Sequence, residues 1–363
     1  MIEKGRISPL QLAILMHPTI LATAALIVPS LTMQAAGRDM WMTPFLASII
    51  GLLTVYVMYK LHCKFPNDTF VEYVDTILGP CMGRALSLIY LISFIYSTGI
   101  VLREYGEFIV ETFLVQTPII IVMICMAAVC GYSVHAGIEV IARSAQVLVP
   151  PAICVIFGML VIMAPDMHLK QIQPILEHGL FPSVAGSLIL GSWFSQFFLI
   201  AFLLPILKEK GKPALKWSLI SLGVVVLTML SINFAVLFIF GTLSKDLNYP
   251  FLTAVRYISL ADFLEHIESL LMSVWLIGIF IKVAVGYYVS VLAAAQCLKL
   301  SSYRSLILPI GFLIVLFSIW AAPNFGVLTQ ILKTTIPFYS LTFQLLLPIL
   351  LLVLAAIRKG KKQ

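Results

Sequence analysis

The chain has 363 residues, of which 61% are hydrophobic and only 11% are charged. Soluble domains carry about 45–50% apolar and about 25% charged residues, so this composition cannot build a water-facing surface of Lys and Glu. It excludes a soluble enzyme, a nucleic-acid-binding protein and a disordered chain, and it predicts a polytopic membrane protein. The net charge of +7 reflects the Lys and Arg that membrane proteins collect on cytoplasmic loops.

Long windows without charge separate the clusters of charged residues. The charge-free windows are 7–37, 40–59, 85–102, 112–138, 144–165, 178–207, 217–244, 305–332 and 334–357. A further window, 269–298, is broken only by Lys282. Each window holds a helix of about 20 residues, which crosses about 30 Å of hydrocarbon. The sequence therefore predicts an all-α polytopic membrane protein with ten transmembrane helices in a single domain, 1–363. A β-barrel is excluded because its strands would alternate between apolar and polar residues.

Positive charges are distributed unevenly between the two sides of this arrangement. Ten spans put both termini on the same side, and we place that side inside. The inside segments then carry 16 Lys and Arg residues and the outside segments carry six. This excess predicts that both termini are cytoplasmic.

Two spans have breaking or polar residues at their centres, where transporters place small-molecule sites. In the first span, Pro18 removes a backbone hydrogen bond and the small residues of 22–24 allow close backbone approach. In the sixth span, the polar residues of 191–196 are costly at depth unless they face a partner or a cavity. The alternatives are a proline kink repaired by threonine hydroxyls and ordinary packing of small residues. The candidate ligand-binding residues of these spans are Thr19, Ala22, Thr23, Trp193, Ser195 and Gln196.

The positions of these two spans predict internal symmetry. Because each half of the chain has five spans, the second half runs inverted relative to the first. Breaks in corresponding spans of inverted halves indicate a transporter-type site. We therefore expect a five-plus-five inverted repeat with broken helices 1 and 6, although the symmetry rests on topology and not on repeated residues.

Lys282 is the only charged residue at the centre of a predicted span. Gly278, Lys282 and Gly286 are spaced i, i+4 and i+8, so they share one helix face. An ammonium group in hydrocarbon costs several kcal/mol, and this one lies about 14 residues from either end of its window, too deep to reach water by extending. We expect Lys282 and Gly286 to line a central pocket. A second interpretation puts Lys282 where a coupling cation would otherwise bind.

The third span has polar residues at its centre and charged residues at its outer end. Ser93 and Ser97 are spaced i, i+4 and are further candidates for ligand binding. The charged residues at the outer end are Arg103, Glu104, Glu107 and Glu111. Of these, Arg103, Glu107 and Glu111 share one face, which favours an Arg–Glu pair. This cluster fits a gate, and it fits a solvated helix end equally well.

Motifs of catalysis and metal binding are missing from the sequence. Neither H-E-x-x-H, G-x-S-x-G nor G-x-x-x-x-G-K-[ST] occurs, and the six histidines lack metal-ligand spacing. We therefore predict that the protein is not an enzyme and uses no cofactor or metal.

Several segments occur together in an order that is typical of one family. The segments are 262–288 (DFLEHIESLLMSVWLIGIFIKVAVGYY), 102–108 (LREYGEF), 64–66 (KFP) with 78–79 (LG), and an ending from Leu-Pro-Ile-Leu to Arg358-Lys359. In this order the chain resembles the B subunit of bacterial spore germinant receptors, also called endospore germination permeases. These proteins belong to the amino acid–polyamine–organocation transporter superfamily.

The resemblance implies a fold, a location and partners. The fold would be the ten-helix inverted repeat with broken helices 1 and 6. The protein would lie in the spore inner membrane, a cell membrane, beside an A subunit and a C subunit lipoprotein. It would bind a small germinant, often an amino acid, and start germination. The chain departs from the superfamily pattern at 22–24, where many members have Gly-x-Gly, at Phe197, where a glycine is common, and at His266, where the family often has an arginine.

Our leading hypothesis is therefore a membrane subunit that binds a small germinant between helices 1, 3, 6 and 8. Hydrogen bonds would come from Ser93, Ser97, Ser195 and Gln196, a wall from Trp193 or Phe197, and charge recognition from Lys282. A helix N-terminus at a break would face the carboxylate of the ligand. The alternatives are a proton- or cation-coupled amino-acid permease and a scaffold subunit with a vestigial pocket.

Overall fold

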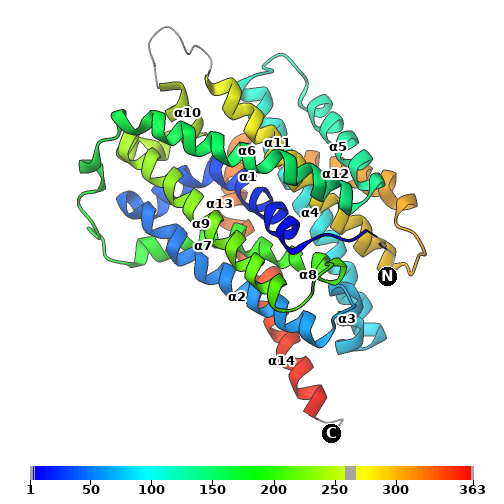
Figure 1. Ribbon diagram of the computed structural model, residues 1–363. Coiled ribbons are helices and arrows are strands. Elements are labelled where there is room, and N and C mark those ends of the chain that lie inside the picture. Colours follow the sequence, from blue (N-terminus) through cyan, green and yellow to red (C-terminus); the bar gives the residue numbers. More distant parts are fainter. Residues whose placement is uncertain (1–2, 4, 258–266, 361–363) are drawn as a thin grey trace.

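The computed structural model describes residue 3, residues 5–257 and residues 267–360, and this part of the chain is almost entirely helical (Figure 1). The helices of the first half are α1 (Pro9–Ala36), α2 (Thr43–Lys64), α3 (Phe70–Leu78), α4 (Pro80–Thr112), α5 (Ile119–Ala136) and α6 (Ile138–Met163). Those of the second half are α7 (Phe181–Phe194), α8 (Ile200–Leu203), α9 (Lys212–Phe240), α10 (Pro250–Tyr257), α11 (Ile267–Cys297), α12 (Ile307–Ala321), α13 (Phe325–Leu341) and α14 (Leu347–Gly360). Short 3₁₀ segments are η1 (Gly37–Met42), η2 (Ala164–Asp166), η3 (Leu169–Ile172), η4 (Ser195–Leu199), η5 (Leu204–Ile206), η6 (Gly241–Asp246) and η7 (Arg304–Leu306), and η8 (Thr342–Leu346) is a π-helical turn.

Nine segments of the described chain are long and apolar enough to cross a membrane. The first of them, Pro9–Lys64, has 56 residues and would extend about 84 Å as a single helix, far more than about 30 Å of hydrocarbon. The chain turns after α1 at Gly37, whose φ of 59° ends that helix, and α2 begins six residues later. The first segment is therefore two helices, and the ten crossings predicted from the charge-free windows are confirmed.

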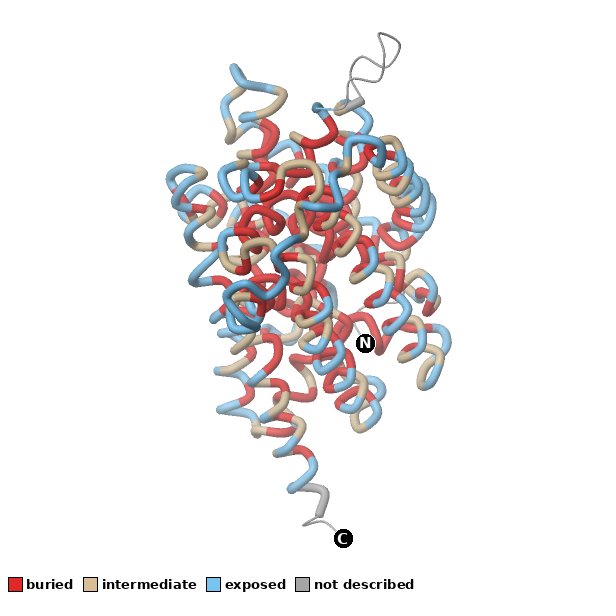
Figure 2. Tube along the Cα trace, turned by 90° about the vertical axis from the view of Figure 1, so that its left-hand side faces the viewer, coloured by how far each residue is buried: buried red, intermediate tan, exposed pale blue. Residues whose placement is uncertain are grey.

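Buried residues concentrate in the middle of the bundle, and exposed residues cover its outside (Figure 2). Helix α1 is central and packs against α6, α7, α9 and α11. The outer surface carries large apolar side chains such as Ile49, Ile92 and Leu308, the last of which is 84% exposed. Side chains of this kind need a hydrocarbon surrounding, which agrees with a membrane-embedded bundle.

The first span contains no break, contrary to the expectation for helix 1. Helix α1 is one continuous helix of 28 residues that accommodates both Pro18 and Pro29. The hydroxyl of Thr19 donates to the carbonyl of Leu15 at 2.7 Å, next to the turn that Pro18 disturbs. No glycine occurs in α1, so its backbone lacks the freedom that an unwound segment needs. A proline accommodated within an intact membrane helix therefore describes this span better than a break.

The sixth span is interrupted, as predicted. After α7 the backbone tightens into the 3₁₀ turn η4, continues as the single α-turn α8, and tightens again in η5. A second interruption lies in the tenth span, where the π-turn η8 separates α13 from α14. Both departures from α-helical geometry occur within spans, and such segments often mark hinges or functional sites.

Helix α3 is a short helix at one end of the bundle. Its N-cap is Thr69, which forms a capping box with Glu72. Its buried face packs against α4. In Figure 1, α3, α8 and the N-terminus lie together at one end of the bundle, and α10 lies at the other. We call these the termini end and the α10 end.

The first residues are held at the termini end by backbone hydrogen bonds. The amide of Ile7 donates to the carbonyl of Ile206 at 3.2 Å, and the amide of Lys208 donates to the carbonyl of Ile7 at 2.9 Å. Further along the same edge, the hydroxyl of Tyr303 donates to the carboxylate of Glu3 at 3.0 Å. We call this pairing of residues 5–8 with 205–208 the N-terminal clasp. It links the start of the chain to the end of the interrupted sixth span.

Candidate functional site

A cavity of about 70 Å³ lies inside the bundle, between α1, α4, the α7–η4 segment, α11, α13 and η8. Its polar lining residues are Thr19, Thr23, Ser97, Thr98, Glu104, Gln196, Lys282, Ser340 and Gln344. Its apolar walls include Phe94, Trp193 and Ile336. About 15 Å³ holds one water molecule, so the cavity has room for roughly five waters or one small ligand.

Seven of the ten candidate ligand-binding residues line this cavity. They are Thr19, Thr23, Ser97, Trp193, Gln196, Lys282 and Gly286. They come from four different spans, and three of them (Thr19, Thr23 and Ser97) carry hydroxyl groups. The chain thus brings together residues that are up to 267 positions apart.

The other three candidates lie outside the cavity. Ala22 is on the opposite face of α1, where it meets Gly278 and lines a smaller apolar cavity. Ser93 lies one helical turn from Ser97, and its hydroxyl donates to a backbone carbonyl of its own helix. Ser195 is fully buried, and its hydroxyl contacts Gln344 at 2.9 Å, so it supports the cavity wall from behind.

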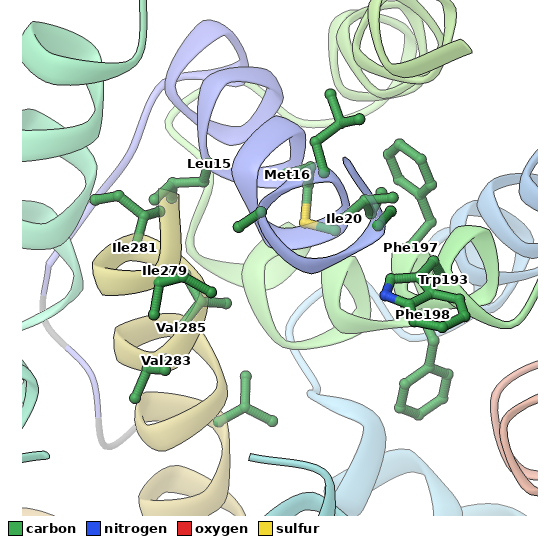
Figure 3. Packing of buried hydrophobic residues seen from close by; sticks show 14 of the residues in the cluster. Leu15, Met16, Ile20, Trp193, Phe197, Phe198, Ile279, Ile281, Val283 and Val285 are labelled. Atoms are coloured by element: carbon green, nitrogen blue, oxygen red, sulfur yellow. The ribbon is translucent and has the colours of Figure 1, made fainter. Parts of the chain in front are cut away.

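The hydroxyl of Thr23 joins three spans at the centre of the site. It accepts a hydrogen bond from Nζ of Lys282 at 2.9 Å and another from the indole nitrogen of Trp193 at 2.7 Å. Figure 3 shows Trp193 on the α7–η4 segment, which packs beside α1. A hydroxyl has two lone pairs, and both are used here, so Thr23 orients the two donors.

Glu104 is a charged site residue that the sequence interpretation missed, together with the polar residues Thr98, Ser340 and Gln344. It comes from α4, lines the cavity and is only 2% exposed. Its Oε1 atom has no hydrogen-bond partner in the described part of the chain. Ser97, Val101 and Glu104 are spaced i, i+4 and i+7, so they form one stripe on α4, and this spacing was available in the sequence.

An aromatic cluster closes the cavity toward the termini end. Its rings are Phe70 of α3, Tyr90 and Phe94 of α4, and Phe198 and Phe202 of the interrupted sixth span. The centroids of Phe70 and Phe198 are 4.7 Å apart in an edge-to-face arrangement. Each such pair contributes about 0.5–1.5 kcal/mol beyond its burial, so the rings form a well-packed layer on this side of the cavity.

The α10 end is more polar. Arg103 and Glu107 form the predicted ion pair at 2.5 Å, and Asn248 donates to Glu111 at 2.5 Å. Burial, and after it the carboxylate of Glu111, raises the pKa of Tyr249, so its hydroxyl stays protonated. This end therefore carries a network of carboxylates with Arg103 and Asn248 as their partners.

A wide hollow of about 500 Å³ opens beside this network at the α10 end. It is lined by the outer ends of α1 and α13 and by the segment after η6, through Ser30, Gln34, Lys245, Asn248, Phe325, Thr329, Gln330, Lys333 and their neighbours. The residues Thr19, Thr23, Ile27, Ser30 and Gln34 follow one another along one face of α1. The hollow and the cavity therefore lie along the same helix face.

Comparison with known proteins identifies the family. Residues 6–326 match the family model of spore germination proteins, the spore permeases. The chain belongs to this spore germination family. Spore germination protein KB of Bacillus subtilis (strain 168) is 30% identical over 369 residues, which cover 99% of this chain and 97% of that protein. Spore germination protein YndE of the same organism is 26% identical and covers 99% of both chains.

Solved structures show the fold. Mhp1, a nucleobase–cation symporter in a closed conformation with bromovinylhydantoin bound, superposes with a TM-score of 0.63 at 12% identity, over 90% of this chain and 75% of that one. A substrate-bound, outward-open Na⁺-coupled sialic acid symporter also gives a TM-score of 0.63, at 11% identity, over 93% of this chain and 79% of that one. The family member therefore has the predicted transporter-type fold of inverted five-helix repeats.

Proposed function

We propose that this spore germination family member is the membrane subunit of a germinant receptor. It binds a small germinant, such as an amino acid, in the central cavity and thereby triggers germination. The observation that carries the proposal is the cavity itself, in which polar side chains from α1, α4, α11 and the interrupted spans converge at the depth of the bundle. Polar groups are costly at such depth unless they bind something, and they commonly mark a ligand path.

The lining supports binding of a small polar molecule. Ser97 and Gln196 offer hydrogen bonds, Trp193 offers a flat wall, and Lys282 offers a positive charge. The interruption of the sixth span at η4 puts Gln196 and the Trp193 wall on a segment whose backbone can change geometry. Ligand binding would change the balance between two arrangements of this segment, which is the form a signal takes in such a receptor.

The proposed orientation puts the termini end in the cytoplasm and the α10 end outside. This follows the excess of Lys and Arg at the termini end. The 500 Å³ hollow then gives the germinant access from outside, and the aromatic cluster around Phe198 closes the cytoplasmic side. Such an arrangement suits detection of an external molecule in the spore inner membrane.

The proposed partners are an A subunit and a C subunit of the receptor, as implied by the resemblance to B subunits. Family membership and the likeness to protein KB support this assembly. Copurification of tagged full-length protein from spore membranes tests it, because absence of both subunits would contradict a receptor complex.

The decisive experiment uses spores that lack the gene, with and without a restored copy. Loss and recovery of the response to one germinant, among amino acids, sugars and nucleosides, is the expected result. A copy with Lys282→Met should fail to restore the response at normal protein level, whereas the exposed control Lys170→Met should restore it. Unchanged responses to every compound in the deletion strain would refute the proposal.

A second candidate function is a proton- or cation-coupled amino-acid permease. The fold likeness to two symporters favours it. Uptake of labelled amino acids into proteoliposomes that contain the purified full chain separates the two candidates. Uptake above that of empty vesicles supports the permease, and binding without uptake supports the receptor subunit.

A further inference from the structure

Two side chains of opposite charge face the central cavity from different helices. Glu104 comes from α4 and is 2% exposed, and Lys282 comes from α11 and is 5% exposed. The two interact electrostatically across the site. Yet Glu104 and Lys282 do not form an ion pair within 4.0 Å. In the part of the chain that the structure describes, the ion pairs within this distance join Arg103 to Glu107 and Arg143 to Glu139. Thr23 lies between them, because its hydroxyl accepts a hydrogen bond from Lys282 at 2.9 Å and also interacts with the carboxylate of Glu104.

Both groups keep unused capacity for hydrogen bonding. An ammonium group has three donors, and Lys282 uses one of them on Thr23. A carboxylate has about four acceptor sites, and Oε1 of Glu104 has no partner in the part of the chain that the structure describes. Buried charges without close partners cost several kcal/mol each. The site is therefore built for an occupant that supplies the missing partners.

We propose that Glu104 and Lys282 form a two-ended recognition site for a small zwitterion. The carboxylate of Glu104 binds the ammonium group of the ligand, and the ammonium group of Lys282 binds its carboxylate. The proposal rests on the proposed function for the location of the ligand, and it adds the rule by which ligands are selected.

The charge balance favours a zwitterion over other ligands of the same size. A ligand with only a positive charge would pair with Glu104 but would be repelled by the ammonium group of Lys282. A ligand with only a negative charge would pair with Lys282 but would be repelled by the carboxylate of Glu104. An uncharged polyol offers hydrogen bonds without charge to either group. A zwitterion satisfies both charges and adds no net charge to a buried site, where charge is most costly.

The size of the cavity also limits the size of the ligand. About 70 Å³ holds roughly five water molecules, which corresponds to five or six non-hydrogen atoms. The apolar walls Phe94, Leu199 and Ile336 leave a small apolar group as the third feature of the ligand. The ligand class is therefore a small α-amino acid with a hydrogen or a short aliphatic side chain.

Ligand binding can be measured on the purified full-length chain in lipid nanodiscs, by the shift in the midpoint of thermal unfolding. The panel is the twenty common amino acids, propionate, ethylamine, L-alaninamide, N-acetyl-L-alanine, glucose and inosine. Glycine or L-alanine is expected to stabilise the protein at concentrations at least 10-fold lower than propionate, ethylamine or either blocked derivative. Equal effects of the one-charge compounds and the zwitterion would overturn the proposal, as would the absence of any effect by all twenty amino acids.

Variants give a signature that a purely structural role would not produce. Glu104→Gln should weaken zwitterion binding at least 10-fold and improve binding of propionate, whereas Lys282→Met should weaken it equally and improve binding of ethylamine. Each variant leaves the opposite buried charge without compensation, and Lys282→Met also removes the hydrogen bond to Thr23, so both should unfold below the wild-type midpoint without ligand. Binding is therefore measured as the ligand-induced shift from each variant's own midpoint. The control is Glu177→Gln, an exposed carboxylate before α7 that lines no part of the cavity, and this variant should bind the zwitterion normally.

The outcomes for this proposal and for the proposed function are separable. Stabilisation by glucose or inosine, without any by amino acids, would leave the receptor function intact and refute zwitterion recognition. Amino-acid binding that depends on Glu104 and Lys282, combined with normal germination of the deletion strain, would support the recognition site and refute the receptor function. Equal binding of amino acids by wild type and Glu104→Gln would refute the role of Glu104.

Discussion

Replacing Thr23 with Val removes one oxygen atom from the centre of the bundle and almost no volume. Two hydrogen bonds are lost, from Lys282 at 2.9 Å and from Trp193 at 2.7 Å. Hydrogen bonds between membrane helices contribute about 0.6 kcal/mol on average and up to about 1.7 kcal/mol each. Because one donor here is charged, we expect a loss of about 2–3 kcal/mol in the free energy of unfolding.

The assay is chemical unfolding of the purified full-length chain in nanodiscs, with Thr23→Ser as the matched control that keeps the hydroxyl. A double-mutant cycle with Trp193→Phe adds a sharper test. The second change should cost less in the Thr23→Val background than in the wild type, since its hydrogen bond is already gone and only the loss of packing remains. A loss below about 0.5 kcal/mol for Thr23→Val, or strict additivity in the cycle, would refute the role of this hydroxyl as the link between α1, α7 and α11.

Three further predictions concern packing, charge and access. Gly99→Val should lower the free energy of unfolding by about 1–3 kcal/mol, because a Cβ at this position meets α12 atoms at 3.1 Å. The control is Gly223→Val, where nothing lies within 4 Å of an added Cβ, and it should change the free energy of unfolding by less than about 0.5 kcal/mol. Equal losses for the two variants would contradict close packing of α4 on α12. Arg103→Met should cost about 3 kcal/mol because it leaves Glu107, a glutamate only 15% exposed, unpaired. Arg143→Met, in an exposed pair of the same 2.5 Å separation, should cost less than about 1 kcal/mol in the same unfolding assay, and similar values would show that burial is not what matters. Gly286→Val puts a side chain into the cavity, since a Cβ at this position lies 2.7 Å from the hydroxyl of Thr98 on α4. The germinant concentration for half-maximal germination should therefore rise at least 10-fold at normal protein level. An unchanged dose–response would place the ligand elsewhere.

The number of helices could be predicted because the bilayer limits the choices. Charge-free windows of at least 18 residues must be spans, and each span must satisfy its own backbone groups by forming a helix. The continuity of α1 could not be predicted in this way. Whether Pro18 breaks a helix depends on neighbouring hydroxyls such as that of Thr19 and on the packing of several helices around it, which the pattern of one segment does not contain.

A site residue could be predicted where its chemistry does not fit an apolar transmembrane span. Lys282 stands out because a charge at the centre of a span needs a reason, and it does line the cavity. Glu104 belongs to the same cavity, yet it is next to Arg103 and three residues from Glu107, so it was assigned to a charged helix end. Ala22 was predicted correctly as a residue that allows close approach of the backbone, but its position in the site was predicted wrongly. It packs against Gly278 on the face of α1 that points away from the cavity.

The N-terminal clasp has a consequence for the order in which the protein is made. Residues 5–8 leave the ribosome first, but their backbone partners at 205–208 are roughly 200 residues behind. At about 5–20 residues per second, that segment waits for about 10–40 s before its partners exist. During this interval α1 is in the membrane without α7, α9 and α11, which later cover most of its surface. Assembly of the first half of the protein therefore has to proceed around an uncovered central helix, and closing of the clasp marks the point at which the sixth span has arrived.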